Sequence, residues 1–414
     1  MRLLVSAYAC EPNKGSESGN GWNWAHGLAK RGHEVYLLTR PHGRDAINNE
    51  LSARPMSTLH VTYVDVPRWS KRYFRGQSGV YAHYFLWQRT ALDVAKRLQP
   101  HLDLVHHVTW GSLHAGSHLW KLGLPFVFGP VGGGQVAPPA FREFFGNGWG
   151  KEWLRTLLTR FLIFSRFHRR MLSNSILVLA TNEETVMMAN RLGAPRVNFF
   201  LDTGLPEGFY PPESPVRQPS AELRVLWIGR LYPRKALPLA FMAIERAVAM
   251  GVPAHLTVVG DGPLGLKVPT WIRHYSLEGR VDWWGQVPWR RVRDAYASHD
   301  VFLFTSLRDS CPAQLLEAMA FGLPIITLSH QGARGLVPNQ AGLKVPVTNP
   351  DQVAEELAKG LHLLWKEPRK AELMGRAGLE FARQQAWPLR IVRMERLYES
   401  VLGSCSVGSS GPDA

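Results

Sequence analysis

The stretch VFLFTSLRDSCPAQLLEAMAFGLPIITLS, residues 301–329, contains an apolar run, a polar loop, a helix-forming segment and a second apolar run. The runs VFLFTS and PIITLS have the composition of buried strands. The segment between them predicts a helix over 314–321 that ends at Gly322. Two strands joined by a helix form a crossover unit of a parallel sheet. The fold that we expect is therefore α/β.

The same alternation extends over the whole chain. Seven short runs rich in Val, Ile, Leu and Phe occur up to residue 202, and six more occur from residue 223 onward. Nearly continuous apolar strands separated by helices are typical of parallel sheets covered on both faces. Thirteen strands are too many for one ordinary doubly wound sheet, so two such domains are predicted.

A proline-rich segment separates the two sets of strands. Residues 210–222, YPPESPVRQPSAE, contain four prolines and are typical of an interdomain linker. We predict a first domain over 1–209 and a second over 223–387. A last amphipathic helix is predicted over 388–403, and 404–414 has the composition of a disordered tail.

The composition is that of a globular protein with an excess of positive charge. The 414 residues include 48 Lys and Arg against 33 Asp and Glu, a net charge of +15. Residues 51–182 carry 16 of the basic and 5 of the acidic side chains, which predicts a phosphorylated substrate, an anionic lipid or a nucleic acid as partner. The three cysteines form neither a zinc-binding nor a disulfide pattern. No apolar run reaches the ~18 residues needed to span a bilayer, so we expect a cytoplasmic protein.

Two acids lie around the start of the helix in the opening stretch. Asp309 precedes the predicted N-cap Ser310, and Glu317 lies inside the helix. The unpaired amides of a first helical turn form an anion site suited to phosphate. We expect Asp309 to accept hydrogen bonds from sugar hydroxyls and Glu317 from a ribose diol. The phosphate would lie near Ser310 and the amides of Cys311, Ala313 and Gln314. For this loop alone, two solvated acids are the simpler alternative.

A second loop, WIGRLYPRKALPLA over residues 227–240, follows the first strand of the second domain. Arg230 and Lys235 are five residues apart across a turn and could clamp a diphosphate. Both would stabilise the charge that develops on a departing phosphate. We expect Arg234, which lies between them, to be solvated.

Glycine-rich turns supply further candidates. VVGDGPLG, residues 258–265, contains G-x-G-x-x-G, but it does not follow the first strand of a domain, as a dinucleotide fingerprint would. We interpret Gly260 as part of a tight turn that approaches a bound nucleotide. Gly15 and Ser16 open a helix whose amides could meet a phosphate. In GPVGGGQ, Gly132 and its neighbours would let the backbone approach a ligand closely.

Together these motifs resemble the GT4 family of retaining glycosyltransferases, which have the GT-B fold of two Rossmann-like domains. The resemblance covers nearly the whole chain and is strongest from WIGRLYPRKA through SLRDSCPAQLLEAMAFGLPII. It implies that Asp309 contacts the donor sugar, that Glu317 contacts the ribose, and that Arg230 and Lys235 bind the diphosphate. It further implies that Trp284 lies near the nucleobase and that the last helix crosses back to the first domain.

The chain departs from the family pattern at three places. Asp309 stands where the family has glutamate, Gly15-Ser16 stands where it has Gly-Gly, and no histidine follows the fifth strand. His106 and His107 end the strand before it, and we expect them to be structural. The implied reaction transfers a sugar with retained configuration, and the departing β-phosphate takes the acceptor proton. No Asp-x-Asp motif occurs, so neither a metal nor another cofactor is expected.

The basic first domain is expected to bind a saccharide or lipid-linked acceptor, in polysaccharide or glycolipid synthesis. Residues 68–76 and 151–171 mix cations with large apolar side chains and could contact the anionic inner face of a membrane. For 151–171 a core-packed helix is the alternative. The basic and aromatic composition also fits nucleic acid, but no such motif occurs, so none is expected.

Three other classes of function stay open from the sequence. A glycoside hydrolase also uses two carboxylates, but it has no need of the Arg230 and Lys235 pair. The assignment as a nicotinamide-dependent oxidoreductase would rest on the GDGPLG motif alone. A non-catalytic protein that binds nucleotide sugars would share the site but show no turnover.

Overall fold

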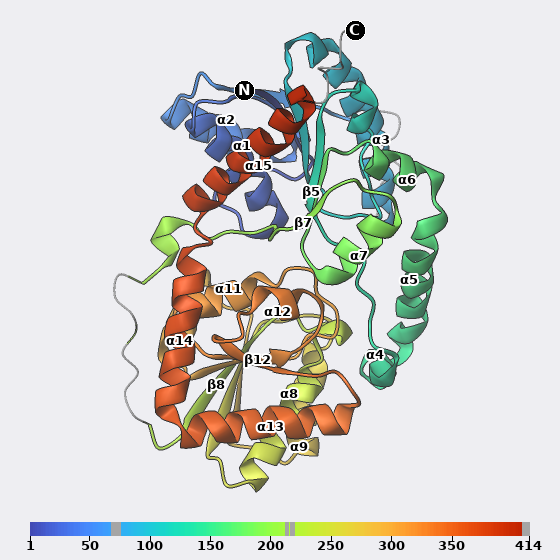
Figure 1. Cartoon of the computed structure of the whole chain (residues 1–414). Helices are drawn as coiled ribbons and strands as arrows, with labels where there is room; N and C mark the ends of the chain where they lie inside the picture. Colours follow the sequence, from blue (N-terminus) through green and yellow to red (C-terminus); the bar gives the residue numbers. More distant parts are fainter. Residues whose placement is uncertain (68–75, 212–214, 216–219, 408–414) are drawn as a thin grey trace. The chain divides into compact units, whose positions relative to one another are not determined.

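The computed structural model describes residues 1–67, 76–211, 215 and 220–407 (Figure 1). Its internal contacts divide the chain into two units, which we call unit 1 and unit 2. Unit 1 comprises residues 1–134, 159–204 and 387–414, and unit 2 comprises 135–158 and 205–386. The predicted domain boundaries stay predictions. The division places 135–158 with the second unit, and most of the predicted linker lies outside the described residues.

Unit 1 is built on a parallel sheet of seven strands in the order β3-β2-β1-β4-β5-β6-β7. The strands are β1 Arg2–Ala7, β2 Glu34–Thr39, β3 Leu59–Tyr63, β4 Leu104–Thr109, β5 Phe126–Val131, β6 Leu177–Ala180 and β7 Val197–Phe199. Because β1 and β4 are neighbours, the chain switches direction across the sheet between them. In doubly wound sheets, ligands bind at the carboxyl ends of the strands beside such a switch.

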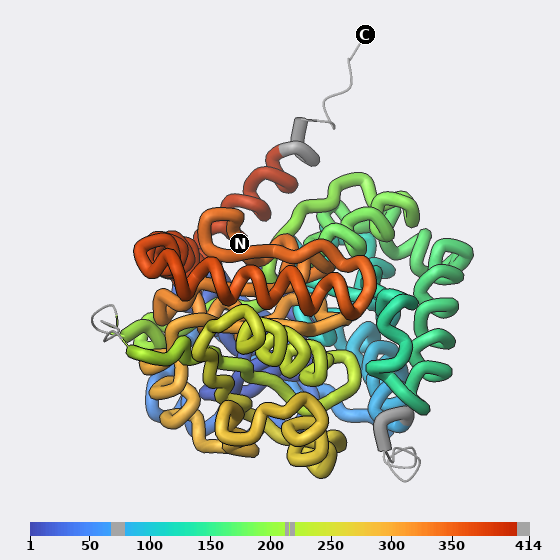
Figure 2. The backbone as a smooth tube through the Cα atoms, turned by 90° about the horizontal axis from the view of Figure 1, so that it is seen from below, coloured from blue at the N-terminus to red at the C-terminus, as the bar shows by residue number. Residues whose placement is uncertain are grey.

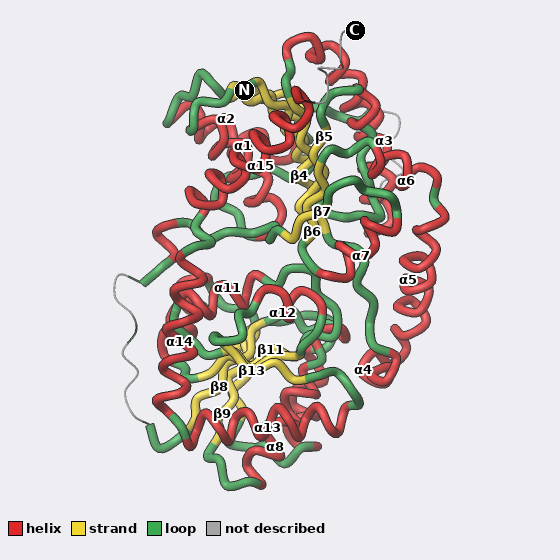
Figure 3. The backbone as a smooth tube through the Cα atoms, in the orientation of Figure 1, coloured by secondary structure: helices red, strands yellow, loops and turns green. Residues whose placement is uncertain are grey.

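Helices cover both faces of this sheet (Figure 3). Successive side chains of β1 point to opposite faces, so Leu3 and Val5 join one apolar cluster and Leu4 the other. Gly27 of α1 allows close packing by the last helix, because a Cβ there would lie 2.7 Å from the side chain of Ile391. The helices are α1 Ser16–Lys30, α2 Arg44–Ala53, α3 Gly76–Leu98, α6 Arg166–Ser173, α7 Glu183–Arg191 and α15 Trp387–Val407.

Unit 2 is built on a parallel sheet of six strands in the order β10-β9-β8-β11-β12-β13. The strands are β8 Leu223–Ile228, β9 Ala254–Val259, β10 Val281–Gly285, β11 Val301–Phe304, β12 Ile325–Leu328 and β13 Gly342–Val345. The switch in strand order falls between β8 and β11. All thirteen predicted strands are therefore confirmed, and each sheet has the order of a doubly wound fold.

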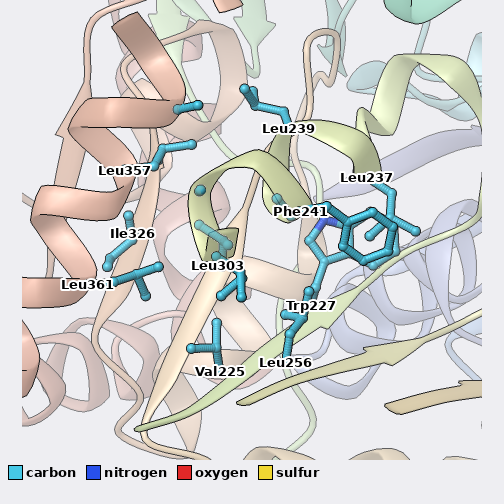
Figure 4. Packing of buried hydrophobic residues seen from close by; sticks show 14 of the residues in the cluster. Val225, Trp227, Leu237, Leu239, Phe241, Leu256, Leu303, Ile326, Leu357 and Leu361 are labelled. Atoms are coloured by element: carbon cyan, nitrogen blue, oxygen red, sulfur yellow. The ribbon is translucent and has the colours of Figure 1, made fainter. Parts of the chain in front are cut away.

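The helices of unit 2 enclose its core. They are α4 Arg142–Phe145, α8 Leu237–Ala249, α9 Val268–His274, α10 Trp289–Ser298, α11 Ala313–Ala320, α12 Gln331–Leu336, α13 Pro350–Lys366 and α14 Pro368–Arg383. Helices α8 and α13 pack side by side on one face of the sheet (Figure 2). Figure 4 shows Leu357 and Leu361 of α13 on one side of this core, Leu237 and Phe241 of α8 on the other, and Leu303 of β11 between them. This core fixes the strand ends that carry the loops of interest.

Three predicted segments differ in detail. Helix α15 extends to Val407, beyond the predicted end at 403. Residues 151–171 form two helices: α5, Trp149–Phe161, is followed by a 3-10 turn, and α6 begins after the capping Ser165. Of the predicted membrane segment 68–76, all but Gly76 lies outside the described residues.

Candidate active site

A cluster of charged side chains in unit 2 lies at the switch between β8 and β11. The loop after β8 ends in a 3-10 turn, Pro233–Lys235, and the loop after β11 carries Asp309. Lys235 forms an ion pair with the Oδ2 atom of Asp309. The Ser306 hydroxyl donates a hydrogen bond to the same oxygen over 3.3 Å. The adjacent strands thus bring together two predicted site residues that are 74 positions apart.

Arg234 also faces this carboxylate. Its Nη1 atom lies 3.5 Å from Asp309 Oδ2 and donates to the Arg308 carbonyl over 3.1 Å. The expectation that Arg234 is solvated is therefore wrong, because the 3-10 turn directs it toward the β11 loop. Arg230 is exposed, and its role in diphosphate binding stays a prediction.

Burial and charge act on this pair in opposite directions. Burial alone would raise the pKa of Asp309, but Lys235 and Arg234 outweigh it and lower that pKa. Burial lowers the pKa of Lys235, and the Asp309 carboxylate opposes this effect. The carboxylate is therefore ionised at neutral pH. Two cations around one carboxylate leave an excess of positive charge, which suits a diphosphate.

The helix after this loop, α11, begins within one residue of the predicted start but has a different N-cap. Its N-cap is Pro312 with ψ of 101°, so the prediction of Ser310 as the N-cap is wrong. A proline disfavours the helical conformation of the residue before it, which keeps Cys311 out of the helix. The amides at the start of α11 are then those of Ala313 and Gln314, since the Leu315 amide bonds back to the Pro312 carbonyl. The predicted helix stop is confirmed, because Gly322 has a left-handed φ of +66°.

Glu317 lies inside α11 in different surroundings from Asp309. Its Oε2 atom accepts a hydrogen bond of 2.8 Å from the Tyr296 hydroxyl of α10. Burial raises the pKa of Glu317 to about 7, against the opposing effect of this hydrogen bond. The two acids of the motif therefore differ in charge state, one ionised and one poised near neutral pH.

The glycine turn after β9 packs against the loop that carries the cations. Gly260 has φ of +126°, and a Cβ there would meet the carbonyl oxygen of Gly229. The Leu231 amide donates to the Asp261 carbonyl over 3.0 Å. Only a short 3-10 turn and α9 follow, instead of the long helix of a dinucleotide fingerprint. The absence of a side chain at Gly260 thus allows the two loops to pack closely. Contact of Gly260 with a nucleotide stays a prediction.

Trp284 lies at the end of β10. The guanidinium of Arg291 is 4.8 Å from the centre of its ring, while the neighbouring Trp283 donates from Nε1 to the Gly260 carbonyl over 3.0 Å. Trp283 thereby holds the glycine turn in place. Contact of Trp284 with a nucleobase stays a prediction.

In unit 1 the predicted glycines gather at the switch between β1 and β4. Ser16 has φ of +58°, the left-handed region that glycine adopts most easily. The Gly132 amide donates to the Gly111 carbonyl over 3.0 Å. The glycines beside it approach the protein's own backbone, since a Cβ on Gly134 would meet the Glu184 carbonyl. Their contact with a ligand stays a prediction.

Comparison with known proteins identifies the family to which the chain belongs. Residues 22–201 match the family model described as glycosyl transferase 4-like domain, and residues 222–362 match that of glycosyl transferases group 1. Together these matches cover more than three quarters of the chain. The chain belongs to the group 1, or GT4, glycosyltransferases. Family membership predicts an enzyme and agrees with the resemblance derived from the motifs.

Individual relatives of this glycosyltransferase match over shorter stretches. WcaL of Escherichia coli, assigned to colanic acid biosynthesis, is 31% identical over 151 residues, which are 35% of this chain and 37% of WcaL. The phosphatidylinositol N-acetylglucosaminyltransferase GPI3 subunit of Saccharomyces cerevisiae is 25% identical over 222 residues, 53% of this chain and 48% of that protein. The chain therefore spans less than half the length of these curated relatives.

A solved structure shows the same fold. The structure of Anabaena Alr3699/HepE in complex with UDP covers 97% of this chain and is itself fully covered, with a TM-score of 0.61 at 16% identity. The predicted GT-B fold is thereby confirmed. Among the described residues, no helix has both the length and the apolar content that crossing a membrane requires.

The motif analysis of this glycosyltransferase missed Glu17. Its Oε1 atom accepts a hydrogen bond of 2.6 Å from the Gly111 amide, and burial raises its pKa to about 7. A signal was available, because an acid follows Gly15-Ser16 directly in the first turn of α1. His106 and His107, by contrast, are fully buried. Burial lowers their pKa values to about 4 and about 3, which supports a structural role.

Proposed function

We propose that the chain transfers a sugar from a nucleoside-diphosphate sugar to a hydroxyl of a saccharide or lipid-linked acceptor. The observation that carries this proposal is the convergence of Lys235 and Arg234 on Asp309 beside the start of α11. The cations and the helix amides would hold the diphosphate. Asp309 would then stand next to the donor sugar as a hydrogen-bond acceptor for its hydroxyls.

The proposed mechanism needs no dedicated base. The sugar C1–O bond to the β-phosphate breaks, the acceptor oxygen attacks from the same face, and the departing phosphate oxygen takes the acceptor proton. The configuration at C1 is retained. Arg230 and Lys235 stabilise the negative charge on the leaving diphosphate, a role whose loss typically costs 10²- to 10³-fold in rate. We propose that these cations fill the role of a metal and that no other cofactor takes part.

The relatives support the choice of substrates. UDP is bound by Alr3699/HepE, so we propose a UDP-sugar as the first donor to test, with a GDP-sugar as the second. WcaL is assigned to an exopolysaccharide, and the GPI3 subunit to an N-acetylglucosaminyltransferase that acts on phosphatidylinositol. We therefore propose a role in polysaccharide or glycolipid synthesis, in which Glu317 contacts the donor ribose.

Contact with a membrane is a further part of the proposal. Helix α5 and the turn after it expose large apolar side chains along one side, at spacings of one face of a helix. They are Trp153, Leu154, Leu158, Phe161 and Phe164, with exposures of 54% to 68%. Exposed Lys151 and Arg160 lie at the edges of this stripe. We propose that this stripe, the α5 stripe, rests on an anionic membrane surface and gives access to a lipid-linked acceptor.

A nucleotide-sugar screen tests the central proposal. A donor at about a hundredfold excess over its Kd raises the free energy of unfolding by about 2.7 kcal/mol, so thermal unfolding identifies it. Slow release of the nucleoside diphosphate from that donor then shows turnover. Lys235→Ala and Asp309→Ala should each lower turnover at least about 100-fold, whereas Lys359→Ala, on an exposed part of α13, should not.

Each rival class has its own outcome in this screen. Saturable stabilisation by NADH instead of nucleotide sugars would favour an oxidoreductase. Hydrolysis of glycosides without any nucleotide would favour a hydrolase. Binding of a nucleotide sugar with no turnover would identify a non-catalytic binding protein.

A further inference from the structure

Unit 1 contains a cavity that the proposed donor site leaves unexplained. It has a volume of about 360 Å³ and lies beyond the carboxyl ends of β1, β2 and β3. The polar side chains that line it are Tyr8, Arg40, His42, Asp65 and His83. A second cavity of about 200 Å³ shares Tyr8 and Arg40 with it and extends to Ser16 and Glu17. The two cavities therefore adjoin each other on unit 1, and we call them together the unit 1 site.

Arg40 is held in this site as an available cation. Its guanidinium lies 4.7 Å from the centre of the Tyr8 ring. That ring is buried and stacks on Trp110, with 5.8 Å between the ring centres. No carboxylate of the described residues forms an ion pair with Arg40. Arg40 interacts electrostatically with Glu17 but is not directly paired with it. A guanidinium that rests on a rigid aromatic ring and has no direct ion-pair partner is suited to bind an anionic group of a ligand.

The other side chains fit a sugar ring. The Tyr8 hydroxyl and His83 Nδ1 are hydrogen-bonded over 2.9 Å, so both groups are fixed at the wall of the cavity. Asp65 lies at the same cavity and Glu17 at the adjoining one. Carboxylates accept hydrogen bonds from hydroxyls, whereas Arg40 and the two histidines supply donors. Hydroxyl acceptors beside one guanidinium indicate a ligand that is both hydroxylated and acidic.

We propose that this site binds an acidic saccharide, with its phosphate or carboxylate on Arg40 and its hydroxyls toward Asp65 and Glu17. The inference rests on the proposed function, because it assigns the class of acceptor. The volume agrees with this size of ligand, since small-molecule sites measure about 300–1,000 Å³.

The test compares matched probes on the full chain by titration calorimetry. The acidic probes are p-nitrophenyl β-D-glucuronide and glucose 1-phosphate, and the neutral match is p-nitrophenyl β-D-glucoside. We expect at least one acidic probe to bind about tenfold more tightly than the glucoside. The tighter of the two acidic probes shows whether Arg40 prefers a carboxylate or a phosphate. Arg40→Gln should remove this preference, and Arg40→Lys should retain part of it. Arg97→Gln, at an exposed position of α3, should leave it unchanged.

Three results would overturn the inference: equal affinity for acidic and neutral probes, no binding of either acidic probe at millimolar concentration, or a preference that survives in Arg40→Gln with its fold intact by circular dichroism. Hydrolysis of the nucleotide sugar by the wild-type chain is measured separately. If hydrolysis occurs but the preference is absent, only this inference fails. If no nucleotide sugar is bound or hydrolysed, the proposed function itself fails.

Discussion

Asp309 and Glu317 show how two carboxylates of one motif acquire different chemistry. Asp309 lies within the loop after β11, beside two cations, and stays ionised. Glu317 lies one turn inside a helix, accepts a hydrogen bond from Tyr296, and has a pKa raised to about 7. The sequence pattern identifies both residues as acids near a helix start. Their charge states follow from neighbours that lie on other elements.

The Lys235–Asp309 pair should contribute to both stability and turnover. Lys235→Met leaves a buried carboxylate with only Arg234 nearby, so we expect the free energy of unfolding to fall by about 3 kcal/mol. The double variant Lys235→Met/Asp309→Asn removes both charges and should recover most of this loss, while both variants stay inactive. Urea unfolding and donor hydrolysis measure the two effects. A single variant as stable as the wild type would show that the ion pair is not formed in solution.

The raised pKa of Glu317 predicts a specific dependence of stability on pH. The folded protein binds this proton with a pKa of about 7, against an ordinary value of 4.5. The folded state therefore holds more protons between pH 4.5 and 7, and stability falls as the pH rises through this window. Glu317→Gln should be more stable than the wild type at pH 8, by up to about 3 kcal/mol, and equal to it near pH 4. The control is Glu356→Gln at an exposed position. A constant difference at all pH values would contradict the assignment.

At the scale of elements, α5 leaves one apolar face exposed. Its inner side is fixed in unit 2 by Glu152, which lies 2.7 Å from Arg308. Its outer side carries the α5 stripe. Exposed apolar patches of this kind usually mark an interaction surface. The sequence showed cations mixed with large apolar side chains in this segment. It could not show which face is covered.

The α5 stripe makes a prediction about vesicles. Trp153→Ser and Phe161→Ser should each weaken binding to anionic lipid vesicles several-fold, because each removes a large side chain from the acyl boundary. Cosedimentation with phosphatidylglycerol vesicles measures this. Leu373→Ser is the matched control, since Leu373 is 57% exposed on α14. If the control weakens binding as much as the stripe variants, α5 is not the contact surface.

At the scale of the whole molecule, the net charge of +15 should set the long-range attraction to an anionic membrane. Exposed charges are screened beyond about 8 Å at physiological salt. Binding of the wild type to anionic vesicles should therefore fall steeply between low and high salt, and neutral phosphatidylcholine vesicles should bind weakly at any salt. Binding to both vesicle types that is insensitive to salt would show that charge plays no part.

The sequence by itself determined the thirteen strands and the two doubly wound sheets, and it placed Lys235 and Asp309 at one site, although their ion pair appears only in the structure. These features follow from local periodicity and from the rule that loops at a switch in strand order lie together. Only the tertiary structure decided that Arg234 faces Asp309, that residues 135–158 group with unit 2, and that Glu17 and Arg40 line one cavity. Such choices depend on which distant element covers a side chain, because burial and neighbouring charge, not spacing along the chain, set its partners and its ionisation.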